Sequence, residues 1–311
     1  MTVILTEAPV APVESGRGVM TLAMLAMGAC WGLSQPLTKT AVSTGHGAFG
    51  LVFWQMMIAA LLLSAINIVR GKGLPLRPTA LKLYAFIALA GTVIPNSISY
   101  TAAFHLPSGV MSIVVSTVPM FALPIALMLG TDRFSWRRLL GLALGLAGVA
   151  LIALPEASLP DVAVVAFVPL ALIAPFCYAV EANVVGRWGV DGLDPVQVLQ
   201  GASIIGVLVM LPIALGTGQF IDPRLPWGLP EGALILSSLI NALVYTAYVW
   251  IVGQAGAVFA AQVSYFVTGF GVVWAMVLLG ERYSLFVWAA LLLMLLGLSL
   301  VQPRRPRVEI A

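Results

Sequence analysis

Long apolar runs follow one another along almost the whole chain, and short breaks rich in charge, proline or glycine separate them. A helix needs about 20 apolar residues to cross the hydrocarbon core of a bilayer. Runs of this length can only be helices there, because hydrocarbon offers backbone N–H and C=O groups no other partner. The pattern predicts ten transmembrane helices, near residues 18–42, 46–69, 81–104, 107–130, 135–154, 162–187, 193–216, 227–251, 255–279 and 284–302.

The composition agrees with a protein that lies mostly in lipid. Of 311 residues, 61% are hydrophobic and 9% are charged, and the mean hydropathy is +1.05. A soluble domain carries about 25% charged residues, so no water-soluble fold could cover this much apolar surface. No polar block is long enough for a separate catalytic domain. The segments outside the runs are a flexible cytoplasmic tail at 1–17 and a basic cytoplasmic tail at 303–311.

The basic residues are distributed unequally between the two sides of the predicted bundle. With the N-terminus in the cytoplasm, only Lys39, Arg224 and Arg282 lie on the outer side. The inner loops and tails hold Arg17, Arg70, Lys72, Arg77, Lys82, Arg133, Arg137, Arg138, Arg187, Arg304, Arg305 and Arg307. Lys and Arg stay on the cytoplasmic side during insertion, so both termini are expected there. The net charge of +3 reflects this topology and no stripe with interleaved aromatics, so nucleic acid is not an expected partner.

The second half of the chain repeats motifs of the first half at a spacing of about 145 to 149 residues, the mark of a duplicated bundle. At the ends of the fourth and ninth runs, Asp132, Arg133, Phe134 and Ser135 match Glu281, Arg282, Tyr283 and Ser284. In the third and eighth runs, Asn96, Tyr100, Thr101 and Ala102 match Asn241, Tyr245, Thr246 and Ala247. In the first and sixth runs, Cys30 and Trp31 match Cys177 and Tyr178.

A copy of five spans is followed by a second copy that enters the membrane upside down, because five is an odd number. The charges agree with this inversion, since the first copy keeps Arg137 and Arg138 after its turn and the second has Phe286 and Val287. We therefore predict an all-α membrane protein of ten transmembrane helices, with two inverted five-helix repeats around a central cavity. The repeats are expected at residues 18–155 and 162–302.

Three motifs make the chain resemble the EamA-type members of the drug/metabolite transporter superfamily. They are WGLSQPLTK from Trp31 to Lys39, Pro119 in the fourth helix, and the two acidic-Arg-aromatic-Ser turns described above. The resemblance implies a basket of helices in which the first, third, fourth, sixth, eighth and ninth spans surround the cavity. Family members move amino acids, nucleobases, drugs and other metabolites, so the resemblance does not identify the solute.

Glu181 is the sharpest candidate for a coupling or binding residue. It lies within the sixth run, about six residues or roughly 9 Å from the inner end at Arg187. An acidic residue at a helix centre costs about 2.5 to 3.5 kcal/mol on insertion, so it usually faces water, a partner or a site. Such a carboxyl group would suit proton coupling or an ammonium solute. The alternative is a carboxylate paired with Arg187 or capped by Asn183.

Other polar and aromatic residues recur on the faces of the helices that the resemblance turns toward the cavity. We expect substrate contacts from Trp31, Ser34, Gln35, Asn96, Tyr100, Ser116, Tyr178, Asn241, Tyr245, Gln262 and Tyr265. Alternatively, such side chains tie helices together or lie in the aromatic belt at the membrane surface.

A few other residues have simpler interpretations. Lys39 ends the first run and is expected to extend to the membrane surface, and His105 is expected to be packed or solvated beside a turn. Gly141, Gly145 and Gly148 form a small-residue stripe on the fifth run, which allows close helix packing and could also form a homodimer contact.

These features favour a secondary transporter of the inner membrane that moves a small organic solute, such as an amino acid, amine or related metabolite. Export coupled to protons at Glu181 is the expected mode. An intramembrane enzyme is the alternative, but the sequence has no His-Glu-x-x-His motif, phosphate loop or evident acid/base pair. A passive channel is a further alternative. No cofactor or metal is expected, and the partners are the solute and the lipid bilayer.

Overall fold

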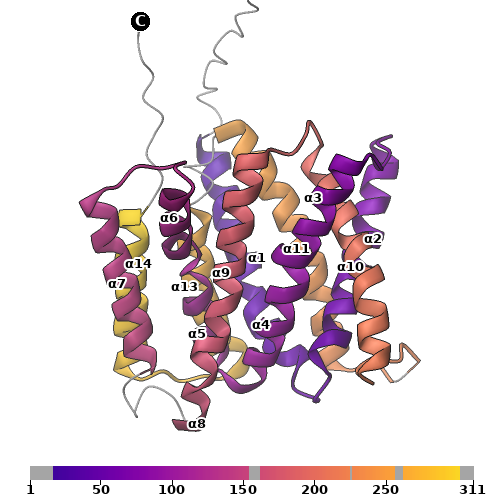
Figure 1. Cartoon of the computed structure of the whole chain (residues 1–311). Helices are drawn as coiled ribbons and strands as arrows, with labels where there is room; N and C mark the ends of the chain where they lie inside the picture. The colour runs from indigo at the N-terminus through magenta and orange to yellow at the C-terminus, as the bar shows by residue number, and fades with distance from the viewer. Residues whose placement is uncertain (1–16, 154–161, 225, 256–261, 302–311) are drawn as a thin grey trace, which may run out of the picture.

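The computed structural model describes residues 17–153, 162–224, 226–255 and 262–301, and within these ranges it holds helices and no strand. The helices stand side by side as a bundle (Figure 1). The predicted all-α class is therefore confirmed for the described residues. The predicted tails 1–17 and 303–311 lie outside them, apart from Arg17, at which the first helix begins.

Six helical stretches are long and apolar enough to cross a membrane, and two shorter helices, Val263–Leu279 and Leu285–Val301, are also apolar. These helices agree with a membrane protein, while the count of ten spans remains a prediction. In chain order the described elements are α1 (Arg17–Ala41), α2 (Ala48–Val69), α3 (Pro78–Ala88), the π-helical turn η2 (Leu89–Val93), α4 (Ile94–His105), α5 (Ser108–Val115), α6 (Val118–Met128), α7 (Trp136–Ala153), α8 (Val162–Val165), α9 (Phe167–Trp188), α10 (Pro195–Gly216), α11 (Leu229–Ala255), α13 (Val263–Leu279) and α14 (Leu285–Val301).

The third predicted span is one continuous helical stretch with a wide turn in its middle. Helices α3 and α4 are joined by η2, and Pro95 follows directly after that turn. Proline has no N–H and its ring clashes with the carbonyl four residues earlier, which here belongs to Gly91. The wide turn accommodates this clash, and single π turns of this kind are frequent at functional sites.

The fourth predicted span is broken into α5 and α6. Between them, the Ser116 and Thr117 hydroxyls donate to the carbonyls of Ile113 and Val114 at 2.6 and 2.7 Å. Pro119 then lies in the first turn of α6, where a missing N–H costs nothing. Local side-chain bonds therefore satisfy the backbone at a break inside an apolar run.

The helices pack in a regular set of pairs. Helix α1 packs against α11 and α13, and α9 packs against α4 and α6. Helix α2 contacts α10 and α11, and α10 also contacts α3. Helix α7 lies beside α14 at one edge of the bundle (Figure 1).

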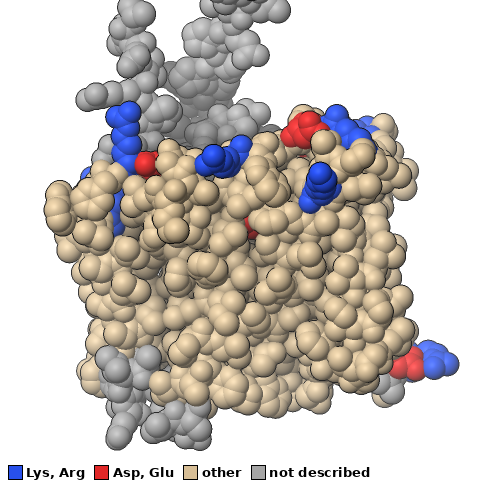
Figure 2. Space-filling view, viewed as in Figure 1, with Lys and Arg blue, Asp and Glu red and all other residues tan. Residues whose placement is uncertain are grey.

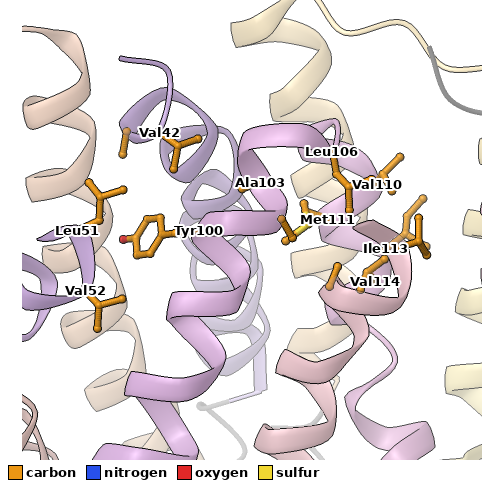
Figure 3. Close-up of a cluster of buried hydrophobic side chains, with 14 of the residues drawn as sticks. Val42, Leu51, Val52, Tyr100, Ala103, Leu106, Val110, Met111, Ile113 and Val114 are labelled. Carbon is orange, nitrogen blue, oxygen red and sulfur yellow. The ribbon is translucent and has the colours of Figure 1, made fainter. Parts of the chain in front are cut away.

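A buried apolar cluster joins the first two helices to α4 and α5. Its members include Leu51, Val52, Tyr100, Val110 and Ile113 (Figure 3). The Tyr100 ring lies beside the two residues of α2 in this cluster, and the whole side chain is only 4% exposed. The cluster holds α4, which carries several of the candidate site residues, against α2.

The glycine stripe on α7 is used inside the chain. An added methyl group at Gly141 would meet the Gly297 carbonyl oxygen at 2.7 Å, and one at Gly148 would meet the Ala290 carbonyl oxygen at 3.1 Å. Gly145 lies against the Met120 side chain. The stripe therefore allows α7 and α14 to approach closely.

Charged residues gather at one end of the bundle. In the view of Figure 2, Lys and Arg lie mainly along the end at which α1 begins and α14 ends, and the face toward the viewer shows few charged atoms. Asp194, just before α10, binds Arg70 and Lys72 at 2.6 Å each. This end of α2 is therefore tied to the beginning of α10 by ion pairs.

Candidate functional site

The Glu181 carboxyl group lies against a part of η2 that has no side chain. An added methyl group at Gly91 would stand 2.7 to 2.8 Å from the carboxyl atoms of Glu181, which is closer than atoms can pack. Among the described residues, none forms a hydrogen bond or an ion pair with this carboxylate. The absence of a side chain at Gly91 thus leaves room for a carboxyl group that no described residue neutralises.

The two residues that could have paired with Glu181 have other partners. The Asn183 amide donates to the carbonyl oxygens of Ala122 and Ala179, at 3.2 and 2.8 Å. Arg187 donates to the carbonyl oxygen of Leu129 at 2.8 Å, at the end of α6. Both side chains therefore satisfy backbone groups of α6 or α9.

Three of the predicted site residues belong to one chain of hydrogen bonds across α9, α4 and α2. The Tyr178 hydroxyl donates to Asn96 Oδ1 at 2.6 Å, and Asn96 Nδ2 donates to Gln55 Oε1 at 3.1 Å. The Tyr100 hydroxyl donates to the same Gln55 oxygen at 3.2 Å. Tyr178 lies one helical turn before Glu181, so the chain of bonds runs from α2 to the part of α9 that carries Glu181.

Gln55 was not predicted, because the second span was not among those expected to surround the cavity. The signal was present, since Gln55 is a polar residue in the middle of a helix of mean hydropathy 2.1. A polar side chain at that depth needs a partner or a function. The sequence could not show that α2 turns this residue toward α4.

A second group of predicted residues lies where α1 meets α11. The Ser34 hydroxyl donates to Asn241 Oδ1 at 3.4 Å. The Trp31 and Tyr248 rings have centroids 5.8 Å apart, and Tyr245 lies 6.4 Å from Tyr248. Tyr245 also interacts electrostatically with Glu181, so this aromatic group lies near the carboxyl group from the side of α11.

The remaining predicted residues are less closely connected with Glu181. Ser116 bonds within its own helix. The backbone carbonyl of Gln262 caps the first turn of α13, where it accepts the Tyr265 N–H at 3.1 Å. For Gln35, no side-chain bond to any described residue is formed. None of these three positions is joined to the Tyr178 chain by a hydrogen bond recorded among the described residues.

Lys39 and His105 have structural surroundings at the outer end of α4. The Lys39 ammonium donates to the carbonyl oxygens of Ala103, Phe104 and Leu106 at 2.8 to 3.0 Å, so it caps this helix end. His105 stacks on Phe167 with ring centroids 3.6 Å apart. The expected packed role of His105 agrees with this stacking, and Lys39 is held by backbone and does not extend freely to the surface.

Two hollows lie near the ends of the bundle. One of about 260 Å³ lies between α6, α9 and α14, and includes Asn183 and Asp132. The other, of about 240 Å³, is lined by His46, Tyr100 and His105. Neither is lined by Glu181, so the central cavity around this residue remains a prediction.

Metal chemistry has no evident support. Within the described part of the chain, no group of three or more His, Cys, Asp or Glu side chains could hold a metal ion. The arrangement offers an unpaired carboxyl group, amides and phenols, which can bind a proton or a polar organic solute.

Known proteins resemble this chain along most of its length. The uncharacterized transporter YvbV of Bacillus subtilis (strain 168) is 26% identical over 293 residues, which is 93% of this chain and 92% of YvbV. The uncharacterized inner membrane transporter YedA of Escherichia coli (strain K12) is 37% identical over 103 residues, or 32% of each chain. The aligned part thus spans about a third of the length of YedA.

The fold is also shared with a solved structure described as "Crystal structure of protein". That likeness has a TM-score of 0.64 at 15% identity and covers 91% of this chain and 96% of the other. The EamA-like transporter family matches this chain twice, at residues 18–154 and 166–302. The chain therefore belongs to the EamA-like transporter family of the drug/metabolite transporter superfamily, and its long apolar helices agree with a multi-pass membrane protein.

Proposed function

We propose that this protein is a secondary transporter of the inner membrane that exports a small organic solute bearing an ammonium group in exchange for protons at Glu181. Ten helices in two inverted repeats would form its framework, with both termini in the cytoplasm. The observation that carries the proposal is the Glu181 carboxyl group, which lies inside an apolar bundle beside Gly91 and without a cationic partner among the described residues.

The packing of the helices supports two equivalent halves. The counterparts of α1, α11 and α13 in the other half are α9, α4 and α6. Helix α1 packs against α11 and α13, and α9 packs against α4 and α6 in the same way. The contact of α2 with α11 likewise becomes that of α10 with α3. Pairs such as α2 with α10 and α7 with α14 map onto themselves, as expected for helices beside a two-fold axis.

Local geometry repeats in the same way. Gly71 and Gly218 lie 147 positions apart, end α2 and α10, and have φ of +64° and +68°. The residue after each glycine reaches the beginning of the other helix: Lys72 binds Asp194, and Gln219 Oε1 accepts the Phe49 N–H at 3.0 Å. Equivalent positions thus join the same two helices at opposite ends.

The charge distribution supports the proposed orientation. The basic end of the bundle is the one at which α1 begins and α14 ends (Figure 2). Basic residues favour the cytoplasmic side, so this end would face the cytoplasm.

Charge balance at Glu181 supports exchange of a cation for a proton. An ionised carboxylate inside a membrane is costly unless a positive charge accompanies it. No described Lys, Arg or His forms an ion pair with Glu181. A proton and the ammonium group of the solute would therefore bind Glu181 alternately. This competition couples the movement of the proton to that of the solute.

The surroundings of Glu181 do not suit a phosphorylated solute. Phosphate binding needs Lys or Arg. Arg187 donates to the carbonyl oxygen of Leu129, and Lys39 is held by three carbonyl oxygens of α4 and its following turn. An enzyme is also disfavoured, because the chain belongs to a transporter family. Helices broken near the site favour alternating access over a passive channel.

The test is counterflow of labelled alkylamines and amino acids in proteoliposomes that contain the purified full-length chain. We expect Glu181→Gln to lose acceleration by a proton gradient and to lower amine counterflow at least tenfold, about 1.4 kcal/mol. Asp222→Asn serves as the control, because this carboxylate pairs with Arg224 on the surface. Unchanged amine counterflow and unchanged pH dependence in Glu181→Gln would refute the proposal.

A further inference from the structure

Gln55 is an unusual residue for the place that it occupies. It lies in α2 between Trp54 and Met56, in a helix whose mean hydropathy is 2.1. Burying an amide in an apolar environment without partners costs several kcal/mol. The amide oxygen has two hydrogen-bond donors, and the amide nitrogen has no acceptor among the described residues. The two ends of the amide are therefore considered separately.

The oxygen end of the Gln55 amide is held by two donors from α4. Asn96 Nδ2 donates to Gln55 Oε1 at 3.1 Å and the Tyr100 hydroxyl donates to it at 3.2 Å. Tyr100 is itself buried, with 4% of its surface exposed (Figure 3). These bonds set the orientation of the amide, because its oxygen has to point toward α4.

The nitrogen end carries two N–H donors that no described residue accepts. Every hydrogen bond of the Gln55 side chain is made by its oxygen. The Gln55 side chain is half-buried, and its nitrogen is not among the fully buried polar atoms that lack a partner. The donors are thus available to an acceptor from outside the protein, and the orientation of the amide prepares them for it.

Gln55 and the Glu181 carboxyl group lie against the same helical stretch. Gly91, which lies against the Glu181 carboxyl group, and Asn96, which binds Gln55, are five residues apart on the same helical stretch. This separation is about 7.5 Å along the helix axis. Tyr178 bridges the two places, since it donates to Asn96 and lies one turn from Glu181.

We propose that Gln55 is a specificity-determining residue that binds a carboxylate or carbonyl oxygen of the solute whose ammonium group pairs with Glu181. This inference rests on the proposed function. The solute is then an elongated molecule with a cation at one end and an acceptor several bonds away. Tyr100 and Asn96 act as positioning residues, because they hold the Gln55 oxygen and leave its N–H groups for the acceptor.

Two matched solutes test this assignment in the same proteoliposomes. An ω-amino acid, 5-aminopentanoate, carries both groups, and pentylamine carries only the ammonium group. For Gln55→Leu we expect counterflow of 5-aminopentanoate to fall tenfold or more, since the variant loses a hydrogen bond to a charged group. Counterflow of pentylamine is expected to fall by a clearly smaller factor, and the melting temperature in detergent shows whether the variant is folded.

Chain length provides a second measurement. In the wild type, counterflow of ω-amino acids from glycine to 6-aminohexanoate is expected to pass through a maximum. Gln55→Asn shortens the side chain by one methylene and is expected to move the maximum to a longer solute. Equal losses for 5-aminopentanoate and pentylamine in Gln55→Leu, or no loss for either, would overturn the role of Gln55.

The proposed function is judged separately, on pentylamine alone. If Glu181→Gln leaves pentylamine counterflow unchanged, the function at Glu181 fails and the inference fails with it. If Glu181→Gln lowers it and Gln55→Leu does not discriminate between the two solutes, only the inference fails.

Discussion

Two carboxylates on consecutive long helices, Glu181 in α9 and Asp194 at the start of α10, have opposite surroundings. Asp194 binds Arg70 and Lys72 at 2.6 Å each and accepts the Val196 N–H at 3.0 Å. Glu181 lies inside the bundle with no cation or hydrogen-bond donor bound to it among the described residues. Among the described residues, Asp194 thus has two cationic partners and Glu181 has none.

This difference distinguishes a carboxylate that holds two helices together from the carboxylate to which we assign coupling. The bonds of Asp194 hold the beginning of α10 to the end of α2, and its capping box with Gln197 completes the first turn of the helix. For Glu181, permanent neutralisation by an Arg or Lys would remove the reason to bind a proton or a cation. The proposed exchange needs a carboxylate without a permanent cationic partner, because the proton or the solute has to supply the positive charge.

The largest expected effect concerns stability. Asp194→Ala removes a helix cap, worth about 1 kcal/mol, and two partly exposed ion pairs, worth up to about 1 kcal/mol together. We expect unfolding to become easier by about 2 kcal/mol, seen as a melting temperature roughly 4 °C lower in detergent. Glu181→Gln removes an unneutralised charge, so its melting temperature should be unchanged or higher. A larger loss of stability in Glu181→Gln than in Asp194→Ala would reverse the comparison.

The next effect concerns the space that Gly91 leaves for the Glu181 carboxyl group. Gly91→Ala places a methyl group 2.7 Å from the carboxyl atoms, and the flexible end of the glutamate can move away without unfolding the helix. Transport should fall about tenfold, or 1.4 kcal/mol, with little change in melting temperature. Gly186→Ala is the matched control on α9, because no atom lies within 4 Å of the added methyl group. Equal activity in the two variants would show that the position of the carboxyl group is unimportant.

The smallest effect is a dependence of stability on pH at the α2–α10 junction. Hydrogen bonding to Arg70 holds the pKa of Asp194 well below its ordinary range. A lowered pKa stabilises the folded state above the ordinary value of about 3.9 and loses this effect as the pH falls below it. At pH 7 the free energy of unfolding of the wild type should therefore exceed that of Asp194→Asn by about 1 kcal/mol, seen as a higher melting temperature. The difference should shrink below about pH 4. A difference that stays constant down to pH 3 would mean that the ion pairs contribute nothing.

Part of the candidate site could be recognised from residue type and spacing. Glu181 stands out because a carboxyl group in an apolar run is costly, and Asn96, Tyr100 and Tyr178 stand out because they recur on the faces of apolar helices. Gln55 could not be assigned in this way. A single polar residue in a helix gives no direction, and only the packing of α2 against α4 turns it toward Asn96.

The sequence by itself determined that the described chain is helical and apolar enough for a membrane, since the lengths of the apolar runs and the backbone's need for hydrogen bonds allow little else. It also identified the family, because the motifs around Trp31 and Glu281 are local in the chain. Only the tertiary structure decided that Lys39 caps α4, that Gly91 makes room for Glu181, and that Gln55 presents free N–H groups. These facts depend on distances between helices far apart in sequence, and such distances are set by packing.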